Sequence, residues 1–499
     1  MGETGAEKPD CTHHAKERQM EGRRRPIAYL FVAVIALMLI GWLIVRYLGV
    51  RHLIRALDER DLTVRVAAAS KLLEMDKLSD ALPAQPIIVR SKTAQALGEI
   101  RTDEALSVLG ELLNDQEEAP RRWARNALIK QGSRAMPILL PALAVGGGTT
   151  DEAIIALKAL GPQTADEVRL LLSDRSAYQG AANAMAQLPP QGVPPLVRGC
   201  YTVDQDLRNA CLNNLGLQRV EAAVDAALHN LGSEDSNNKK GAGIKALGFI
   251  GDRRATPALI PFLTDTDNRE AAATALGLLR DPRAVEPIIP TLIVTEKRYR
   301  NAAILALRRI GPPAFPALVK ELTSPQVLKR EAAADALVGS GSATVNAPLM
   351  AALNDNDPEV RASAARALGW PGNVAAVPSL VGVLSDKSWR VVDSAVGALG
   401  AIGVPAADLL VALLRTPGED LTVSYQLARG LAAMRRPAVP KLIAALSDPS
   451  QNLQKWAAVA LGQIGDPSAV DALKKLETTA GPDLRWVVQE QLRRLSSGI

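Results

Sequence analysis

PEVRASAARALGWPGNVAAVPSLVGVLSD, residues 358–386, contains two apolar segments, and the first of them has the spacing of a helix. Ala364 lies four residues before Leu368 and Arg361 lies seven before it, so the three side chains share one face of an α-helix. Asp357 lies eleven residues before Leu368, where a carboxylate accepts hydrogen bonds from the N–H groups of a first helical turn. The first segment therefore predicts a capped helix of roughly three turns, which we call helix A.

The second segment of the same stretch, VPSLVGVL (377–384), begins with a valine–proline pair. Proline is tolerated at the first position of a helix because the N–H there has no intrahelical partner. We predict that this segment is a second helix, helix B, which runs antiparallel to helix A. Gly369 follows Leu368 directly and suits the left-handed position that ends a helix. The whole stretch therefore predicts one helical hairpin.

The pattern around Leu368 returns about every thirty residues, usually with Ala before the landmark leucine and often with Gly after it. The landmarks are Leu72, Leu97, Leu128, Leu160, Leu188, Leu215, Leu247, Leu276, Leu307, Leu337, Leu368, Leu399, Leu431, Leu461 and Leu492. A fixed period of this size indicates units that bury their apolar faces against their neighbours, and no segment alternates as a half-buried strand does. The sequence predicts an all-α fold, a right-handed α-solenoid superhelix of about fifteen hairpins over residues 53–499. A bend or hinge is expected near 188–206, where two successive intervals shorten and prolines cluster.

The stretches 358–386 and WAAVALGQIGDPSAVDALKKL (456–476) resemble HEAT-like repeats of the phycobilisome-lyase (E–Z) type. The resemblance extends over roughly residues 53 to 499. It implies the solenoid fold but no particular activity, because that repeat family includes chromophore lyases, scaffolds, adaptors and regulators.

A membrane span is predicted before the repeats. IAYLFVAVIALMLIGWLIV (27–45) carries no charge and is long enough for ~28 Å of helix across a ~30 Å hydrocarbon core. The run is longer than the apolar core of a typical signal peptide, so we predict an uncleaved single-pass transmembrane helix over 27–48 after a polar tail, 1–26. Basic residues flank the span equally, but Arg23, Arg24 and Arg25 adjoin it directly. This favours an extracytoplasmic solenoid over a cytoplasmic one.

Charge and aromatic content disfavour nucleic acid as a partner. The net charge is +5, but most of the surplus lies in the first 60 residues, and only 3% of the chain is aromatic. A solenoid that tracked phosphates would need a basic stripe that local acids do not cancel, and stacking of bases needs aromatic platforms. The expected partners are therefore proteins and the membrane.

A column of arginines recurs seven residues before the landmarks. Its members are Arg65, Arg90, Arg121, Arg208, Arg269, Arg300, Arg330, Arg361 and Arg485. They share the inward face with Ala and Leu, where an unpaired charge would be costly. We predict a structural ladder in which each guanidinium meets an acid or a helix-end carbonyl of an adjacent unit. A groove that binds an acidic ligand is the alternative.

Four tryptophans fall late in the chain and are candidates for partner binding: Trp370, Trp389, Trp456 and Trp486. Exposed tryptophan is frequently a hot spot of a protein interface. Packing between neighbouring helices is the competing and preferred interpretation.

Catalytic, cofactor and metal residues are not predicted. Cys11, His13 and His14 could ligate a metal, but the polar tail offers no further ligand or supporting shell. Cys211 lies in the column where Ala predominates and is interpreted as a small core residue. Cys200 lies near the end of the preceding helix B, and the turn between them could bring the two cysteines close enough for a disulfide in an extracytoplasmic array. A thiol nucleophile is the least favoured interpretation because no histidine is near in sequence.

We therefore predict a membrane-anchored HEAT-repeat scaffold or assembly factor that mediates protein–protein interactions, and we favour a binding protein over an enzyme. A bilin or chromophore lyase, or a lyase-like chaperone, is the alternative that the family resemblance alone implies. A DNA glycosylase built from similar repeats is a weaker alternative, since charge balance and aromatic content count against it.

Overall fold

The computed structural model describes residues 35–232, 240–415 and 421–497, and the regular elements within these ranges are helices, with no strand among them. The chain divides into two compact units, Met1–Leu196 and Val197–Ile499. The border falls within the segment 188–206, for which a bend or hinge remains a prediction. Each unit is an all-α solenoid of helical hairpins, as the repeat pattern predicts.

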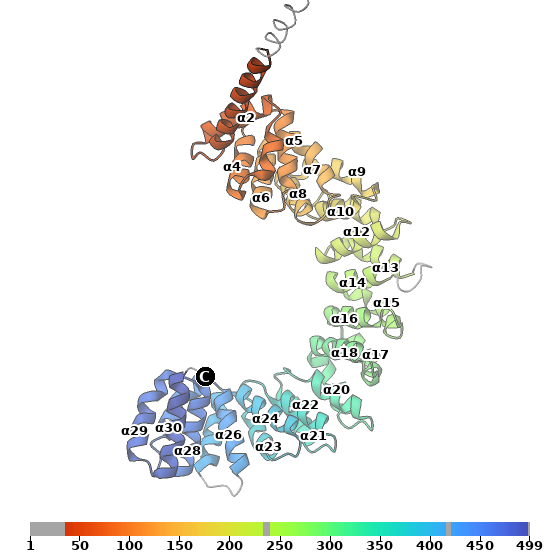
Figure 1. Cartoon of the computed structure of the whole chain (residues 1–499). Coiled ribbons are helices and arrows are strands. Elements are labelled where there is room, and N and C mark those ends of the chain that lie inside the picture. Colours follow the sequence, from red (N-terminus) through yellow and green to blue (C-terminus); the bar gives the residue numbers. More distant parts are fainter. Residues whose placement is uncertain (1–34, 233–239, 416–420, 498–499) are drawn as a thin grey trace, which may run out of the picture. The chain divides into compact units, whose positions relative to one another are not determined.

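The A helices carry the even numbers, and consecutive ones pack against each other within a unit (Figure 1). They are α2 (Leu62–Glu74), α4 (Ile87–Leu97), α6 (Glu118–Gln131), α8 (Gly147–Leu160), α10 (Tyr178–Ala186), α12 (Gln205–Leu217), α14 (Gly241–Ile250), α16 (Arg269–Leu279), α18 (Lys297–Ile310), α20 (Val327–Ala336), α22 (Pro358–Leu368), α24 (Trp389–Ile402), α26 (Leu421–Ala433), α28 (Gln451–Ile464) and α30 (Pro482–Ser497).

The B helices carry the odd numbers and are shorter, and most follow a 3-10 turn. They are α3 (Leu78–Ala81), α5 (Asp103–Leu113), α7 (Met136–Ala142), α9 (Ala165–Leu170), α11 (Val193–Gly199), α13 (Val224–Gly232), α15 (Thr256–Leu259), α17 (Val285–Ile288), α19 (Phe315–Glu321), α21 (Asn346–Ala352), α23 (Val377–Gly382), α25 (Val404–Arg415), α27 (Val439–Ala445) and α29 (Val470–Thr479). Proline occupies the first turn of many of them, as predicted; α23 and α27 are examples.

The predicted aspartate caps of helix A are confirmed in several repeats. The Asp357 carboxylate accepts the backbone N–H of Glu359 at 2.9 Å, and Asp204 accepts two such bonds at the start of α12. Before α16 the arrangement differs, because Asp265 accepts backbone N–H groups in the turn that precedes the helix. The aspartate thus orders the entry to helix A in these three repeats, whereas Glu117 before α6 and Glu296 before α18 make no such bond.

The predicted role of the glycine after the landmark is wrong. Gly369 has φ −80°, and a Cβ at this position would lie 2.6 Å from the Cα of Ala398 in the next A helix. Gly248 stands in the same relation to Ala275, at 2.8 Å. The glycine column therefore allows two A-helix backbones to approach closely, and the alanine before the next landmark completes the contact.

In most repeats helix A ends later than predicted, as α14 does at Ile250, whereas α4 and α22 end at the landmark itself. The residue four positions after the landmark has positive φ in most repeats, for example Gly251 (φ 85°) and Gly465 (φ 74°). Arg280 (φ 50°) and Arg435 (φ 60°) occupy the same position without being glycine. The left-handed residue that ends helix A is real, but it belongs to a different column of the repeat.

Two landmark assignments are also shifted by three residues. In α8 the fully buried leucine is Leu157, whereas Leu160 is half-buried, and Gly161 (φ 99°) follows Leu157 at the expected distance of four. In α10 the burial pattern of the other repeats places Met185, which is 1% exposed, at the landmark position instead of Leu188. The shortened intervals near 188–206 therefore arise largely from misplaced landmarks.

An exposed apolar helix, Ile35–Ala56, precedes the repeats. It has a mean hydropathy of 1.5 over its most apolar window, is long enough to cross a membrane, and has none of that window buried. The predicted span 27–48 begins outside the described residues, and the helix continues past 48 to Ala56. Leu57 follows and is fully buried, while Lys92 binds both the carbonyl and the carboxylate of Asp58 at 2.6 Å. Only the short turn at residues 57–61 therefore separates the apolar helix from α2 of the first repeat.

Candidate functional site

The arginine column lies where each B-to-A turn meets the next repeat, and all nine members have hydrogen-bond or ion-pair partners. Arg65 donates to the carbonyls of Glu59 and Arg60 and to the side chain of Gln95, and Arg121 donates to the carbonyls of Asp115 and Gln116. Arg208 donates to the carbonyl of Thr202, Arg300 to the carbonyl of Val294, and Arg485 to the carbonyls of Glu477 and Ala480. Arg269 forms an ion pair with Glu296. The acceptors of Arg65 follow the apolar helix Ile35–Ala56, and the other carbonyl acceptors lie at the end of the preceding helix B or in the turn after it. At both places the last helical C=O groups lack intrahelical partners.

The remaining three arginines add a bidentate ion pair to this contact: Arg90 with Asp115, Arg330 with Asp355 and Arg361 with Asp386. In the third pair, Nε and Nη2 of Arg361 lie 2.7 and 2.9 Å from the two carboxylate oxygens of Asp386. The Arg361 hydrogen bond lowers the pKa of Asp386, and the same bond raises the pKa of Arg361. Both groups are therefore charged near neutral pH, and the guanidinium is already neutralised within the chain.

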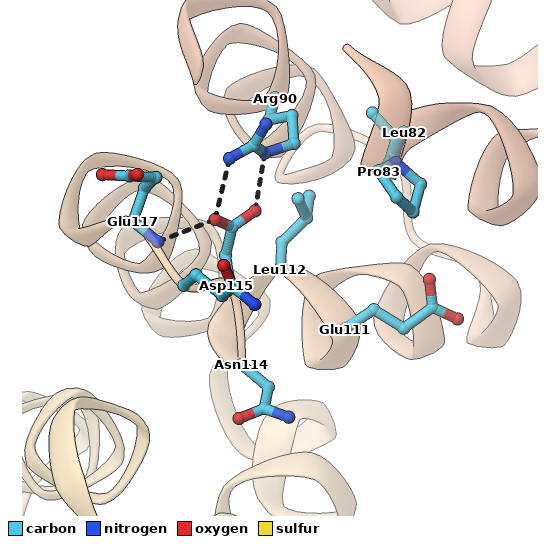
Figure 2. A pocket seen from close by; sticks show the side chains of 9 residues that line it. Leu82, Pro83, Arg90, Glu111, Leu112, Asn114, Asp115 and Glu117 are labelled. Carbon is cyan, nitrogen blue, oxygen red and sulfur yellow. Dashed lines mark hydrogen bonds and ion pairs between the residues drawn. The ribbon is translucent and has the colours of Figure 1, made fainter. Parts of the chain in front are cut away.

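A cavity of about 410 Å³ adjoins the first of these pairs (Figure 2). It is lined by Leu82, Pro83, Arg90, Glu111, Leu112, Asn114, Asp115, Gln116 and Glu117. Figure 2 shows the Arg90 guanidinium facing the Asp115 carboxylate, which also accepts the backbone N–H of Glu117. Because Asp115 occupies the charged edge of Arg90 and Glu111 and Glu117 line the same cavity, this site offers little to an acidic ligand.

A second cavity, of about 490 Å³, opens on α14, α16 and α18. Phe249, which is 42% exposed, and Leu278 supply apolar surface, and Glu270 binds Arg298 at 2.7 Å at the rim. The charges of Glu270 and Arg298 thus compensate each other within the cavity lining.

The four candidate tryptophans have different environments. Trp389 and Trp486 are 73% and 70% exposed, whereas Trp456 is buried and donates from Nε1 to Asn452 at 3.1 Å. Trp370 is half-buried, and its Nε1 is buried without a hydrogen-bond partner among the described residues. The structure thus separates two exposed tryptophans from two that pack within the array.

Two exposed residues of the same region were missed by the sequence reasoning. Leu421 is 63% exposed and occupies the same repeat position as Trp389, ten residues before a landmark. Tyr425 is 42% exposed and shares its repeat position with Trp486, six before a landmark, and its ring lies 6.2 Å from that of Trp456. Alignment of these two columns across repeats would have found both residues.

The cysteines and histidines do not form a metal centre in the part of the chain that the structure describes. No group of three or more His, Cys, Asp or Glu side chains there could hold a metal ion. Cys200 and Cys211 are fully buried and are not in a disulfide. Cys11, His13 and His14 lie outside the described residues.

Two protein-family models match the sequence. The family model described as HEAT repeats matches residues 75–158, 264–338, 315–392, 346–424 and 418–493. The model described as PBS lyase HEAT-like repeat matches residues 240–265. No curated protein matches significantly.

Solved structures share the repeat architecture at low identity. Kap121p is 16% identical with a TM-score of 0.41, over 91% of this chain and 57% of Kap121p, so the chain spans little more than half of that protein. Importin beta is 12% identical with a TM-score of 0.37, over 89% of this chain and 79% of importin beta. The complex of CpcE and CpcF of phycocyanin lyase from Nostoc sp. PCC7120 is 26% identical with a TM-score of 0.26, over 47% of this chain and 93% of the other. With the repeat model matching more than half of the sequence, the chain belongs to the HEAT-repeat family.

Proposed function

We propose that this protein is a membrane-anchored HEAT-repeat scaffold that binds a protein partner through exposed apolar side chains of its C-terminal repeats. The observation that carries the proposal is the exposure of Trp389 and Trp486, at 73% and 70%. Indole rings in water cost free energy that a protein interface can recover, and tryptophan is enriched among interface hot spots. Leu421 and Tyr425 of α26 are also exposed, and we define the C-terminal apolar surface as these two residues together with Trp389 of α24 and Trp486 of α30.

Anchoring is supported by the apolar helix Ile35–Ala56. Side chains along it, such as Leu37 and Met38, are 67% and 69% exposed, so the repeats do not cover them. A hydrocarbon environment would remove this surface from water, and Trp42 and Tyr47 suit the border between lipid and headgroups. The helix is thus better suited to a bilayer than to solvent.

The extracytoplasmic orientation of the repeats is part of this proposal. The basic residues that follow the span are Arg46, Arg51, Arg55, Arg60 and Arg65. Of these, Arg65 is buried and bonded to the carbonyls of Glu59 and Arg60. It therefore serves the fold and not the flank of the span. Without Arg65, fewer basic residues flank the span on the side of the repeats. This supports an orientation set by Arg23, Arg24 and Arg25 on the other side of the span.

Partner binding is tested by purifying the full chain from its membrane after cross-linking, with and without Trp389→Ala and Trp486→Ala. Each substitution should weaken retention of a co-purifying protein at least about tenfold, which corresponds to ~1.4 kcal/mol, and leave thermal stability unchanged because both rings are exposed. Trp456→Ala is the matched control, since it removes a buried ring and should lower stability by ~3–5 kcal/mol. Retention of the partner by both exposed-site variants would refute the proposed surface.

The same purification distinguishes the scaffold from a bilin lyase. A coloured adduct on the purified chain would favour the lyase, whereas a stoichiometric colourless protein partner favours the scaffold. Cys200 and Cys211 are fully buried, so neither presents an exposed thiol for a chromophore.

Membrane insertion and sidedness have their own tests. The full chain should stay with membranes during alkaline extraction, and a phosphatase fused after Ile499 should be active outside the cytoplasm. Replacement of Arg23, Arg24 and Arg25 by Gln should weaken or reverse that activity. Release by alkali would remove the anchor from the proposal, and an inactive reporter would place the array in the cytoplasm.

A further inference from the structure

Two buried cysteines contact each other at the turn from α11 to α12. The thiols of Cys200 and Cys211 are hydrogen-bonded, both side chains are fully buried, and neither is in a disulfide. A Cβ at Gly199 would lie 2.5 Å from Sγ of Cys211, so the glycine leaves the sulfur its space. The absence of a side chain at Gly199 therefore provides the space in which the two sulfur atoms lie next to each other.

The chain between the cysteines is held in place by its own hydrogen bonds. The backbone N–H of Asp204 lies 3.3 Å from the Thr202 hydroxyl, and Arg208 donates to the Thr202 carbonyl at 3.0 Å. Asp204 also caps α12, the helix that carries Cys211. This ordering keeps the two thiols together, which is what ring closure between them requires.

The pair is unsuited to nucleophilic chemistry in the closed fold. The hydrogen bond to Cys211 and burial both raise the pKa of Cys200, so the thiol stays protonated. A protonated, buried thiol is a poor nucleophile and a poor metal ligand. The chemistry that remains open to Cys200 is a reaction with the neighbouring thiol of Cys211.

We propose that Cys200 and Cys211 are a redox modification site that closes to an intramolecular disulfide on exposure to an oxidising thiol–disulfide couple. During local opening, one thiolate attacks the disulfide of a small molecule or an oxidoreductase, forms a mixed disulfide and releases one thiol. The second cysteine thiolate then attacks the chain's sulfur in that mixed disulfide and releases the other thiol. The two cysteines lose two protons and two electrons, and the reagent disulfide is reduced to two thiols.

Closure would stabilise the start of the second unit. A disulfide across this short loop restricts the unfolded chain, while the folded pair is already in contact. The thermal midpoint of the oxidised protein is therefore expected to exceed that of the reduced protein by roughly 5 °C.

In the test, the full-length, detergent-solubilised protein is equilibrated in glutathione redox buffers. Samples that start reduced and samples that start oxidised are incubated until both contain the same fraction of disulfide. Acid quenching, alkylation and tryptic digestion then report the disulfide directly, because trypsin cleaves after Arg198, Arg208 and Arg219. A Cys200–Cys211 disulfide joins the peptides 199–208 and 209–219, and this joined pair should predominate in oxidising buffer together with the raised midpoint.

Matched variants make the result specific. Cys200→Ala and Cys211→Ala should each abolish the joined pair and the redox dependence of the midpoint, and Ala is the residue that other repeats place at the position of Cys211. Cys11→Ser should leave both readouts unchanged. The proposal is wrong if both peptides carry the alkylating label or a glutathione adduct across the whole redox range.

Discussion

Arg361 in α22 and Arg121 in α6 occupy the same position of the repeat but have different surroundings. Nη1 of each donates to a carbonyl six residues earlier, Asp355 at 2.8 Å and Asp115 at 2.7 Å. Arg361 also binds both carboxylate oxygens of Asp386, whereas Nε of Arg121 is buried without a hydrogen-bond partner among the described residues. Its guanidinium instead faces Gly148, where a Cβ would lie 2.8 Å from Nε.

The difference indicates which contact the repeat requires. The end of helix B leaves carbonyl groups without intrahelical partners in each hairpin, so a donor at the start of the next helix A is useful in every repeat. An aspartate on the far side of the guanidinium is an addition that some repeats have and others lack. The recurrence of arginine is therefore explained by the backbone, which favours the structural ladder over a ligand groove.

The helix contact beneath Arg361 should be the most sensitive part of this junction. Gly369→Ala is expected to destabilise by ~3 kcal/mol, because the added Cβ would lie 2.6 Å from Cα of Ala398 and force two backbones apart. Gly382→Ala, in the same repeat, meets nothing within 4 Å and should be neutral or slightly stabilising. Urea unfolding of both variants measures the difference, and equal effects would refute the close-approach role of the glycine column.

The arginine that binds a carboxylate should contribute more stability than the arginine whose bonds are to carbonyls alone. Arg361→Ala is expected to cost ~2–3 kcal/mol, because it removes the guanidinium from the largely buried Asp386 carboxylate and from the carbonyl of Asp355. Arg121→Ala loses carbonyl contacts alone and should cost ~1 kcal/mol. Equal losses in urea unfolding would show that the carboxylate adds nothing, and a loss of partner binding without a loss of stability would revive the ligand groove.

Acid should reduce the difference between the two arginines. The pKa of Asp386 is lowered in the folded state, so its ion pair contributes stability above the unfolded pKa of ~3.9 and loses it as pH falls through the folded value. The cost of Arg361→Ala should therefore decrease below about pH 4, whereas that of Arg121→Ala should stay constant because it has no carboxylate partner. Unfolding curves at a series of pH values test this, and parallel behaviour of the two variants would contradict it.

The smallest effect is expected on the surface of the same junction. Arg390 pairs with Glu359, but their side chains are 57% and 41% exposed. Solvent screening and side-chain entropy should limit the cost of Arg390→Ala to ~0.5 kcal/mol or less. A loss of stability comparable to that of Arg361→Ala would mean that burial does not determine how much each ion pair stabilises the fold.

Much of the fold follows from local rules that act within a few residues. The positions of helix A and helix B, the Asp357 cap and the proline starts of α23 and α27 depend on short-range hydrogen bonding and on the geometry of proline, and they were predicted. An acid or a helix-end carbonyl was the predicted partner of Arg361, because a buried guanidinium requires acceptors nearby, and Arg361 binds the Asp386 carboxylate and the Asp355 carbonyl.

Other features depend on which repeat lies next to which. Gly369 has the same sequence context whether it ends a helix or faces a backbone, and the contact with Ala398 decides between the two. Trp389 lies ten residues before its landmark and Trp456 five before its own, and neighbouring helices leave the first 73% exposed and the second 7%. These assignments needed the packed structure.

The sequence by itself determined a chain of capped helical hairpins, since period, caps and turn residues act over one or two helical turns. The tertiary structure decided which glycines separate helices and which end them, which leucine or methionine is the landmark in α8 and α10, and which aromatic rings reach solvent. The physical reason is that these properties arise from contacts about thirty residues apart, where the shape of the neighbouring repeat determines the space that each side chain has.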